Sequence, residues 1–224
     1  MRNIDSVLFD FDGTIMDTND AVLSSWQHVY RTLEGQERPA EEIYATFGEP
    51  IEVTVANKFP GRDADEVIAV YRSYHVAHYE EMVRLFPGVM EMLDSLKADG
   101  YKMGVVTNRL RRTTVLGLEK YHIEGYFGSV ICAGDAAKNK PAPDPALKAL
   151  AQLGSHPGAA IFVGDSQHDI LCGKNAGIRT VRVSWAVATD ADHGDAAAEP
   201  DHTIDRPSDL TGLLRDLNAR IRGR

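Results

Sequence analysis

The segment Ser6-Val7-Leu8-Phe9-Asp10-Phe11-Asp12-Gly13-Thr14 joins a short apolar run to two aspartates. The apolar run is typical of a buried strand. Residues two apart on an extended chain face the same way, so we expect Asp10 and Asp12 to project together where the strand ends. Gly13 allows the backbone to turn at once. Because two close carboxylates repel each other, this pair favours a bound cation or a shared proton. A capped strand-to-helix turn would explain one aspartate more easily than two.

Further short apolar runs predict the rest of a sheet. Each is followed by a loop or a helical pattern, and they lie at 103–106, 129–132, 160–163 and 180–183. Strands that alternate with helices indicate parallel pairing and an α/β fold with a doubly wound, Rossmann-like sheet. Ligands bind beyond the carboxyl ends of such strands. We therefore expect functional residues directly after each apolar run.

One stretch interrupts this alternation. Between about Asp17 and Phe86 the apolar residues recur at helical spacing, and we find no convincing strand there. The simplest interpretation is an all-helical insertion at residues 16–86, between two parts of an α/β core at 1–15 and 87–224. The insertion carries 13 acidic and 6 basic side chains, which makes it a poor surface for a large polyanion.

A second acidic cluster follows the run at 160–163. Asp165 is expected at the end of that strand, and Asp169 about one helical turn further on. Together with Asp10 they supply hard oxygen ligands of the kind that Mg²⁺ prefers. His168 lies between the two aspartates, and we interpret it as a solvated residue in the first turn of a helix.

Two other segments could hold a phosphate. Thr107 and Asn108 follow the run at 103–106 and offer a hydroxyl, backbone N–H groups and the N-terminus of the next helix. The segment Lys138-Asn139-Lys140-Pro141 offers a lysine next to a proline-rich turn. Either Lys138 or Lys140 could take this role. A single threonine or lysine is usually a surface residue, so the indication comes from the combination.

These four segments, in this order and spacing, resemble the four motifs of the haloacid dehalogenase-like superfamily, and the match extends from Phe9 to Ile170. The helical insertion after the first motif is similar to that superfamily's helical cap. The resemblance implies that Asp10 is the nucleophile and Asp12 the general acid/base. It further implies that Thr107, with Asn108 beside it, and Lys140 bind the phosphoryl group, Lys140 being favoured over Lys138 because it directly precedes the proline.

The resemblance also implies a Mg²⁺ cofactor. Its ligands would be Asp10, Asp165 and the main-chain carbonyl of Asp12, with Asp169 as a further contact, direct or through water. Dehalogenases of the superfamily lack an acid at the second position, so Asp12 argues against that activity. The expected reaction is phosphoryl transfer to Asp10 and then to water.

The cap turn narrows the range of substrates expected within the superfamily. The turn Phe47-Gly48-Glu49-Pro50 resembles the cap turn of phosphoglycolate phosphatases and related pyrophosphatases, so Gly48 and Glu49 are expected to contact a small phosphate ester or pyrophosphate. Arg109, Arg111 and Arg112 could meet a second anionic group, but exposed arginines on a helix are the commoner case. A phosphosugar mutase is the nearest enzymatic alternative, and Glu49 departs from the basic cap turn that such mutases use. A phosphate-binding module without catalysis is the alternative from another class.

Composition excludes several other classes. The chain has 224 residues, and its formal net charge of -9 argues against a nucleic-acid or anionic-membrane surface. No apolar stretch approaches the roughly 20 residues that a membrane helix needs. Cys132 and Cys172 are expected to be reduced and buried. We therefore predict a cytoplasmic enzyme, a monomer or homodimer, without nucleic-acid or membrane partners.

Overall fold

The structure of the chain is a computed structural model, and it describes residues 4–47, 49–186 and 196–222. Contacts divide the chain into two compact units, one made of residues 1–17 and 85–224 and the other of residues 18–84. Two short strands, β2 (Met16–Asp17) and β3 (Arg84–Leu85), pair where the chain passes from one unit to the other and back. These strands are a correction to the prediction of no strand between Asp17 and Phe86, and two residues are too few to leave a periodic pattern.

The described residues of the α/β unit form a six-stranded parallel sheet in the order β5-β4-β1-β6-β7-β8. The strands are β1 (Ser6–Phe9), β4 (Lys102–Val106), β5 (Ser129–Ile131), β6 (Ala160–Gly164), β7 (Arg179–Val183) and β8 (His202–Ile204). The predicted doubly wound α/β class is confirmed, and β8 is the strand that the apolar runs did not reveal.

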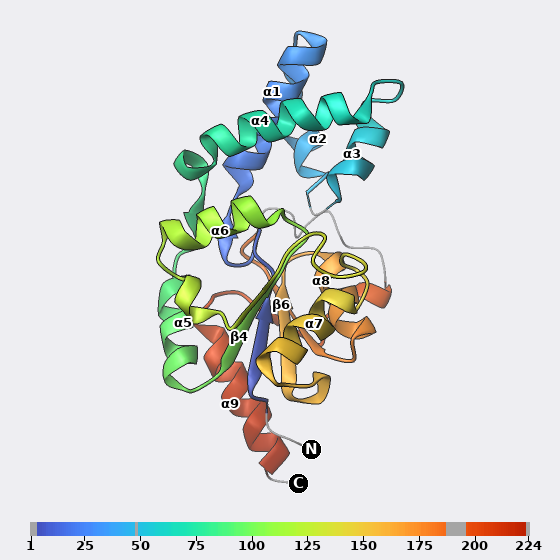
Figure 1. The fold of residues 1–224 in the computed structure, drawn as a ribbon. Coiled ribbons are helices and arrows are strands. Elements are labelled where there is room, and N and C mark those ends of the chain that lie inside the picture. The colour runs from blue at the N-terminus through green and yellow to red at the C-terminus, as the bar shows by residue number, and fades with distance from the viewer. Residues whose placement is uncertain (1–3, 48, 187–195, 223–224) are drawn as a thin grey trace. The chain divides into compact units, whose positions relative to one another are not determined.

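Helices cover both faces of this sheet (Figure 1). On one side lie α7 (Asp144–Leu153) and α8 (Gln167–Asn175), and on the other α5 (Val89–Ala98), α6 (Arg111–Lys120) and α9 (Asp209–Arg222). The short 3-10 helices are η1 (Glu124–Tyr126), η2 (Pro157–Ala159) and η4 (Ala196–Ala198). Leu8, Phe162 and Leu150 belong to the apolar core between the sheet and α7 and α8. Cys172 is part of this core, and both cysteines are buried and free, as predicted.

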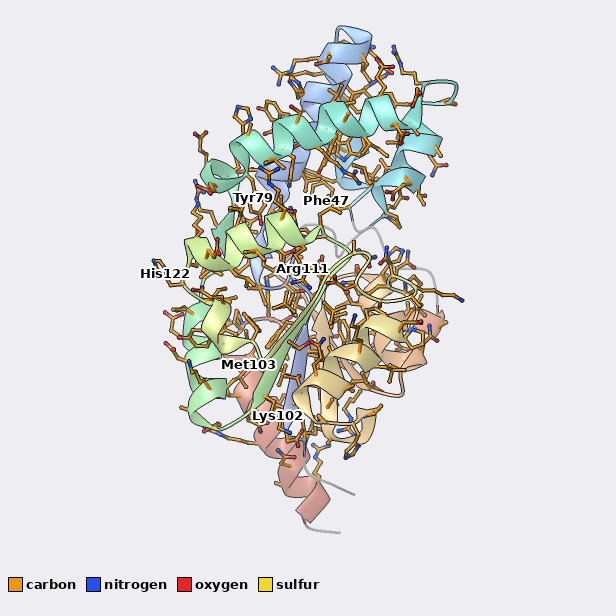
Figure 2. All side chains as sticks on the ribbon, viewed as in Figure 1. Phe47, Tyr79, Lys102, Met103, Arg111 and His122 are labelled. Atoms are coloured by element: carbon orange, nitrogen blue, oxygen red, sulfur yellow. The ribbon has the colours of Figure 1, made fainter. Side chains whose placement is uncertain are left out.

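The strand direction places the functional segments at one edge of the sheet. Lys102 and Met103 begin β4, and Arg111 begins α6 beyond the carboxyl end of the same strand, so their side chains lie near opposite ends of β4 (Figure 2). Since β1 and β6 run parallel to β4, the residues that follow all three strands leave the sheet at this carboxyl edge.

The second unit is helical. Its elements are α1 (Asn19–Glu34), α2 (Ala40–Tyr44), α3 (Ile51–Lys58) and α4 (Ala64–Met82). Trp26 of α1 stacks on Phe59 and packs against Tyr71 of α4, which gives the unit an aromatic core of its own. Asp63 caps α4 by accepting hydrogen bonds from the main-chain N–H groups of Asp65 and Glu66. None of the described helices of either unit has the length and apolar character needed to cross a membrane.

Candidate active site

Asp10 lies at the end of β1, directly between β4 and β6 in the sheet. Its main-chain N–H donates to the carbonyl of Val163 at 2.8 Å, which extends the β1–β6 ladder by one residue. The residue is 6% exposed. Burial, reinforced by the charge of Asp169, raises the pKa of Asp10 to about 7, although Lys140 acts in the opposite direction.

Three carboxylates converge at this point. Oxygen atoms of Asp10, Asp165 and Asp169 lie within 4.8 Å of one another, and all three residues are buried. Burial, followed by the charges of Asp169 and Asp10, raises the pKa of Asp165 well above its usual value. The two acidic segments of the sequence, far apart along the chain, thus meet at one place.

Gly13 makes the close approach of Asp165 possible. Its φ of +72° lies in the left-handed region, and a Cβ at this position would fall 2.2 Å from Oδ2 of Asp165. The N–H of Gly13 donates to the carbonyl of Met16, which closes a tight turn directly after Asp12. Any side chain at residue 13 would therefore displace the Asp165 carboxylate.

Lys140 connects the carboxylates. Its Nζ donates to Oδ1 of Asp10 and to Oδ1 of Asp169, at 2.6 Å in both cases, and the residue is 4% exposed. The attraction of the two carboxylates raises the pKa of Lys140 in spite of its burial, so the ammonium stays charged. Lys138, the other lysine of this segment, is exposed.

Asn108 fixes the loop that carries Lys140. Its amide nitrogen donates to the carbonyl of Lys140 at 3.1 Å, and its amide oxygen accepts from the N–H of Lys140 at 3.0 Å. Both polar ends of the Asn108 side chain are thereby bound to main chain. The neighbouring Thr107 is buried, and its Oγ1 accepts from the N–H of Arg109 at 3.1 Å.

Asp169 has two structural partners. Its Oδ1 accepts from Lys140, and its Oδ2 accepts from the N–H of Ser166 at 3.0 Å and from the Ser166 hydroxyl at 2.8 Å. Ser166 and Asp169 form a capping box at the start of α8. The spacing Ser-x-x-Asp could have indicated this capping box in the sequence. His168, predicted to be solvated, is half-buried, and its Nδ1 is buried without a hydrogen-bond partner among the described residues.

Arg109 binds the second aspartate of the first motif. Its Nε lies 2.9 Å from both carboxylate oxygens of Asp12, and one Nη lies 2.7 Å from Oδ1. Arg109 precedes α6 and its side chain is only 8% exposed, so the prediction of exposed helix arginines is wrong for this residue. Arg111 and Arg112 are exposed, as predicted, and Arg111 pairs with Asp135.

The residues of the proposed cap turn lie in the helical unit. Glu49 is exposed and accepts a hydrogen bond from Oγ1 of Thr54 at 3.0 Å, whereas Gly48 lies outside the described residues. Their predicted contact with substrate remains a prediction.

The residues at the carboxyl edge fit a divalent cation. Three buried carboxylates face a single buried ammonium, so the cluster lacks positive charge. Burial, and after it the charges of the neighbouring carboxylates, raise the pKa values of Asp10 and Asp165, and a bound cation would offset both effects. Their ligand atoms are hard carboxylate oxygens, which suit Mg²⁺. Because both oxygens of Asp169 already accept hydrogen bonds, Asp10 and Asp165 are the better placed direct ligands.

Residues 7–183 match the family model described as haloacid dehalogenase-like hydrolase. The chain belongs to this family. Among its relatives is a protein of Bacillus cereus (strain AH820) named pyrophosphatase PpaX, 36% identical over 215 residues, which cover 96% of this chain and 98% of the relative. The protein of the same name from Anoxybacillus flavithermus is 36% identical over 212 residues, covering 95% of this chain and 97% of its own length.

Solved structures of the haloacid dehalogenase-like fold superpose closely on this chain. A family hydrolase from Streptococcus pneumoniae gives a TM-score of 0.85 at 23% identity, covering 96% of this chain and all of its own. A predicted phosphoglycolate phosphatase from Haemophilus somnus gives 0.81 at 23% identity, covering 95% and 99%. At this identity the likeness establishes the fold. Family membership identifies the chain as a hydrolase.

Proposed function

We propose that this hydrolase is a Mg²⁺-dependent phosphatase that acts on a small phosphate ester or on pyrophosphate through a phosphorylated Asp10. The observation that carries the proposal is the buried Asp10 carboxylate, held by Lys140 at 2.6 Å beside Asp165 at the carboxyl edge of the sheet. A nucleophilic carboxylate on a preorganised strand end is what in-line attack on phosphorus requires.

The groups around Asp10 have complementary roles in this mechanism. Lys140 orients the attacking oxygen and offsets the repulsion between a carboxylate and a phosphate dianion. Mg²⁺, when bound by Asp10, Asp165 and the main-chain carbonyl of Asp12, supplies the remaining positive charge. Phosphoryl transfer has a loose transition state, so positioning and charge neutralisation provide most of the rate enhancement.

Four residues complete the proposed site without attacking phosphorus. Thr107 holds a phosphoryl oxygen. Asn108 contributes by fixing the Lys140 main chain, and Asp169 by anchoring the Lys140 ammonium. Asp12 protonates the leaving oxygen and then takes a proton from the water that hydrolyses the phosphorylated Asp10. We further propose that residues 16–86 form a cap in which Gly48 and Glu49 select the leaving group.

The names of similar proteins narrow the choice of substrates to test. Two relatives are named pyrophosphatases, which favours a phosphoanhydride, and a structural neighbour is described as a phosphoglycolate phosphatase, which favours a small ester. Phosphate release from pyrophosphate, 2-phosphoglycolate and a generic aryl phosphate should be measured while Mg²⁺ is titrated. Activity should rise with Mg²⁺ and disappear with a chelator.

Asp10→Asn is the matched control, because it keeps the size of the side chain and removes the nucleophile. We expect its rate to fall by at least about 10⁴-fold. Appearance of an isomerised phosphosugar in place of free phosphate would favour a mutase. Absence of turnover with every ester, with pyrophosphate and at every metal concentration would favour a phosphate-binding module.

A further inference from the structure

Arg109 is placed to do more than neutralise one aspartate. Its guanidinium spans both oxygens of Asp12 in a fork, with contacts of 2.7 and 2.9 Å. We propose that this guanidinium is the binding site for a second anionic group on the substrate, a carboxylate or a phosphate, which exchanges with the Asp12 carboxylate. The inference rests on the proposed phosphatase function and names the leaving group that the site selects.

The chemistry of the ion pair supports this exchange. A guanidinium offers parallel N–H donors whose spacing matches two oxygens of a carboxylate or of a phosphate equally well. The Asp12 carboxylate therefore stands where a substrate carboxylate would bind with the same geometry. The Asp12 side chain is 33% exposed, in contrast to 8% for Arg109, so the carboxylate is the more accessible member of the pair.

Lys140 and Arg109, the two cations at this edge of the sheet, differ in how deeply their carboxylate partners are buried. Lys140 is enclosed by Asp10 and Asp169, both buried, and it cannot leave either without stranding a buried charge. Arg109 pairs with a partly exposed carboxylate, which water can solvate when the pair opens. The exchange of an anion on Arg109 is therefore far less costly than on Lys140.

The main chain of Arg109 is fixed next to the proposed phosphoryl site. Its N–H donates to Oγ1 of Thr107 at 3.1 Å, and its carbonyl accepts from the N–H of Ala133, beyond β5, at 3.0 Å. An arginine held two residues from a phosphoryl-binding threonine can reach a group attached to the scissile oxygen. Movement of the Asp12 side chain away from Arg109 would also allow the Asp12 carboxyl group to face the scissile oxygen.

This arrangement predicts the substrate class. The preferred substrate carries a second negative charge close to the scissile bond, as in 2-phosphoglycolate, where the charge is a carboxylate, or pyrophosphate, where it is a second phosphate. Phosphate esters with uncharged leaving groups offer no anion that could replace Asp12, so Arg109 would stay paired with Asp12. We expect such esters to be poorer substrates.

The test compares kcat/KM for 2-phosphoglycolate with that for its amide, phosphoglycolamide, which has the same scissile bond without the second charge. Arg109→Gln should lower kcat/KM for phosphoglycolate by about 10- to 100-fold more than for the amide, since a charged hydrogen-bonded contact is lost only with the former. A parallel assay with pyrophosphate identifies which anion the site accepts. A selective loss with either anion supports the proposal.

Two further variants separate anion binding from a role in positioning Asp12. Arg112→Gln removes an exposed arginine three residues away and should leave the ratio of the two substrates unchanged. Arg109→Lys keeps the charge without the fork and should recover part of the selectivity. If Arg109 only positioned Asp12, Arg109→Gln would reduce activity on phosphoglycolate, its amide and pyrophosphate equally, and that result would overturn the proposal.

A binding measurement separates this inference from the proposed function. Phosphonoacetate and phosphonoacetamide cannot be hydrolysed at a phosphoester bond, so calorimetry with Mg²⁺ compares them without turnover. The native enzyme should bind the acid at least about 10-fold more tightly than the amide, and Arg109→Gln should remove the difference. Equal binding to the native enzyme would contradict the inference even if the enzyme proved to be an active phosphatase. Selective binding without turnover would support it while the proposed function failed.

Discussion

The two units of the chain treat buried polar groups in opposite ways. The α/β unit buries Asp10, Lys140, Asp165 and Asp169 together at the ends of its strands. The helical unit, over its described residues, buries neutral hydroxyls and an imidazole but no Asp, Glu, Lys or Arg side chain. The α/β unit also buries Arg182, which donates to the carbonyl of Ala198. Burying charge costs free energy of folding, so the grouping of the other four charged side chains at one edge of the sheet indicates a site where folding stability is lost in favour of chemistry.

The contrast between the buried charges of the two units is tested most directly at Lys140. Lys140→Met leaves three buried carboxylates without a cation, and we expect the free energy of unfolding to fall by about 3–5 kcal/mol without metal. Lys138→Met, two residues away on an exposed side chain, is the matched control and should change stability little. Chemical denaturation measures both. Equal losses for the two variants would show that the buried lysine does not balance the cluster.

The burial of Asp10 beside other carboxylates also predicts how the free energy of unfolding depends on pH. The pKa of Asp10 is about 7 in the folded enzyme, against 3.8 for an unperturbed aspartate, so between these values the folded state holds a proton that the unfolded chain has released. Without metal, the free energy of unfolding should therefore fall as pH rises from about 4 to about 7, by up to about 4 kcal/mol. Mg²⁺ should reverse this loss at about pH 8, because it binds the folded state. Thermal melts with a chelator and with Mg²⁺ test this, and a metal-free stability that rises over this range would contradict it.

Gly13 allows a sharper comparison between the units. Gly13→Ala places a Cβ 2.2 Å from Asp165, so the carboxylate must move and Mg²⁺ affinity should drop by roughly 10- to 100-fold. Gly35, at the end of α1, has nearly the same φ, +75°, but no atom within 4 Å of an added Cβ. Gly35→Ala thus carries the same backbone strain without the clash. Calorimetric titration with Mg²⁺ should distinguish the two, and equal affinities would show that Gly13 does not shape the metal site.

The smallest effect is expected in the helical unit. Ser25 and His75 are both buried there, with Oγ and Nδ1 2.9 Å apart. Ser25→Ala should lower the free energy of unfolding by about 1–2 kcal/mol, because the imidazole loses a neutral hydrogen-bond partner. We expect the Mg²⁺ affinity to stay unchanged, since neither residue belongs to the charged cluster. A change in metal affinity as large as that of Gly13→Ala would erase the contrast between the units.

The sequence predicted the sheet well because its central strands are continuous apolar runs followed by polar residues. Parallel topology then brings Asp10 and Asp165 to the same edge, so their convergence follows from the strand order alone. The three-residue β8 was missed because its partly exposed residues make no apolar run. The extent of each predicted strand otherwise agrees with the structure to within one residue at either end.

Side-chain partners across the site could not be predicted in the same way. The pairing of Arg109 with Asp12, and of the Asn108 amide with the main chain of Lys140, depends on rotamers and loop geometry that no local pattern encodes. The capping box of Ser166 and Asp169 did have a local signature, and it accounts for one oxygen of an aspartate that we expected to contact metal. Local motifs therefore identify the residues of the candidate site, whereas the partners of their side chains are known only from the structure.

The most direct measurement traps the phosphorylated enzyme. The native protein is mixed with ³²P-labelled substrate and Mg²⁺, quenched in acid within the first turnover and digested for peptide mapping. Label on the peptide that contains Asp10, absent in Asp10→Asn, is the predicted result. Rapid phosphate release with no labelled peptide, or label on a residue other than Asp10, would contradict the assignment of Asp10 as the nucleophile.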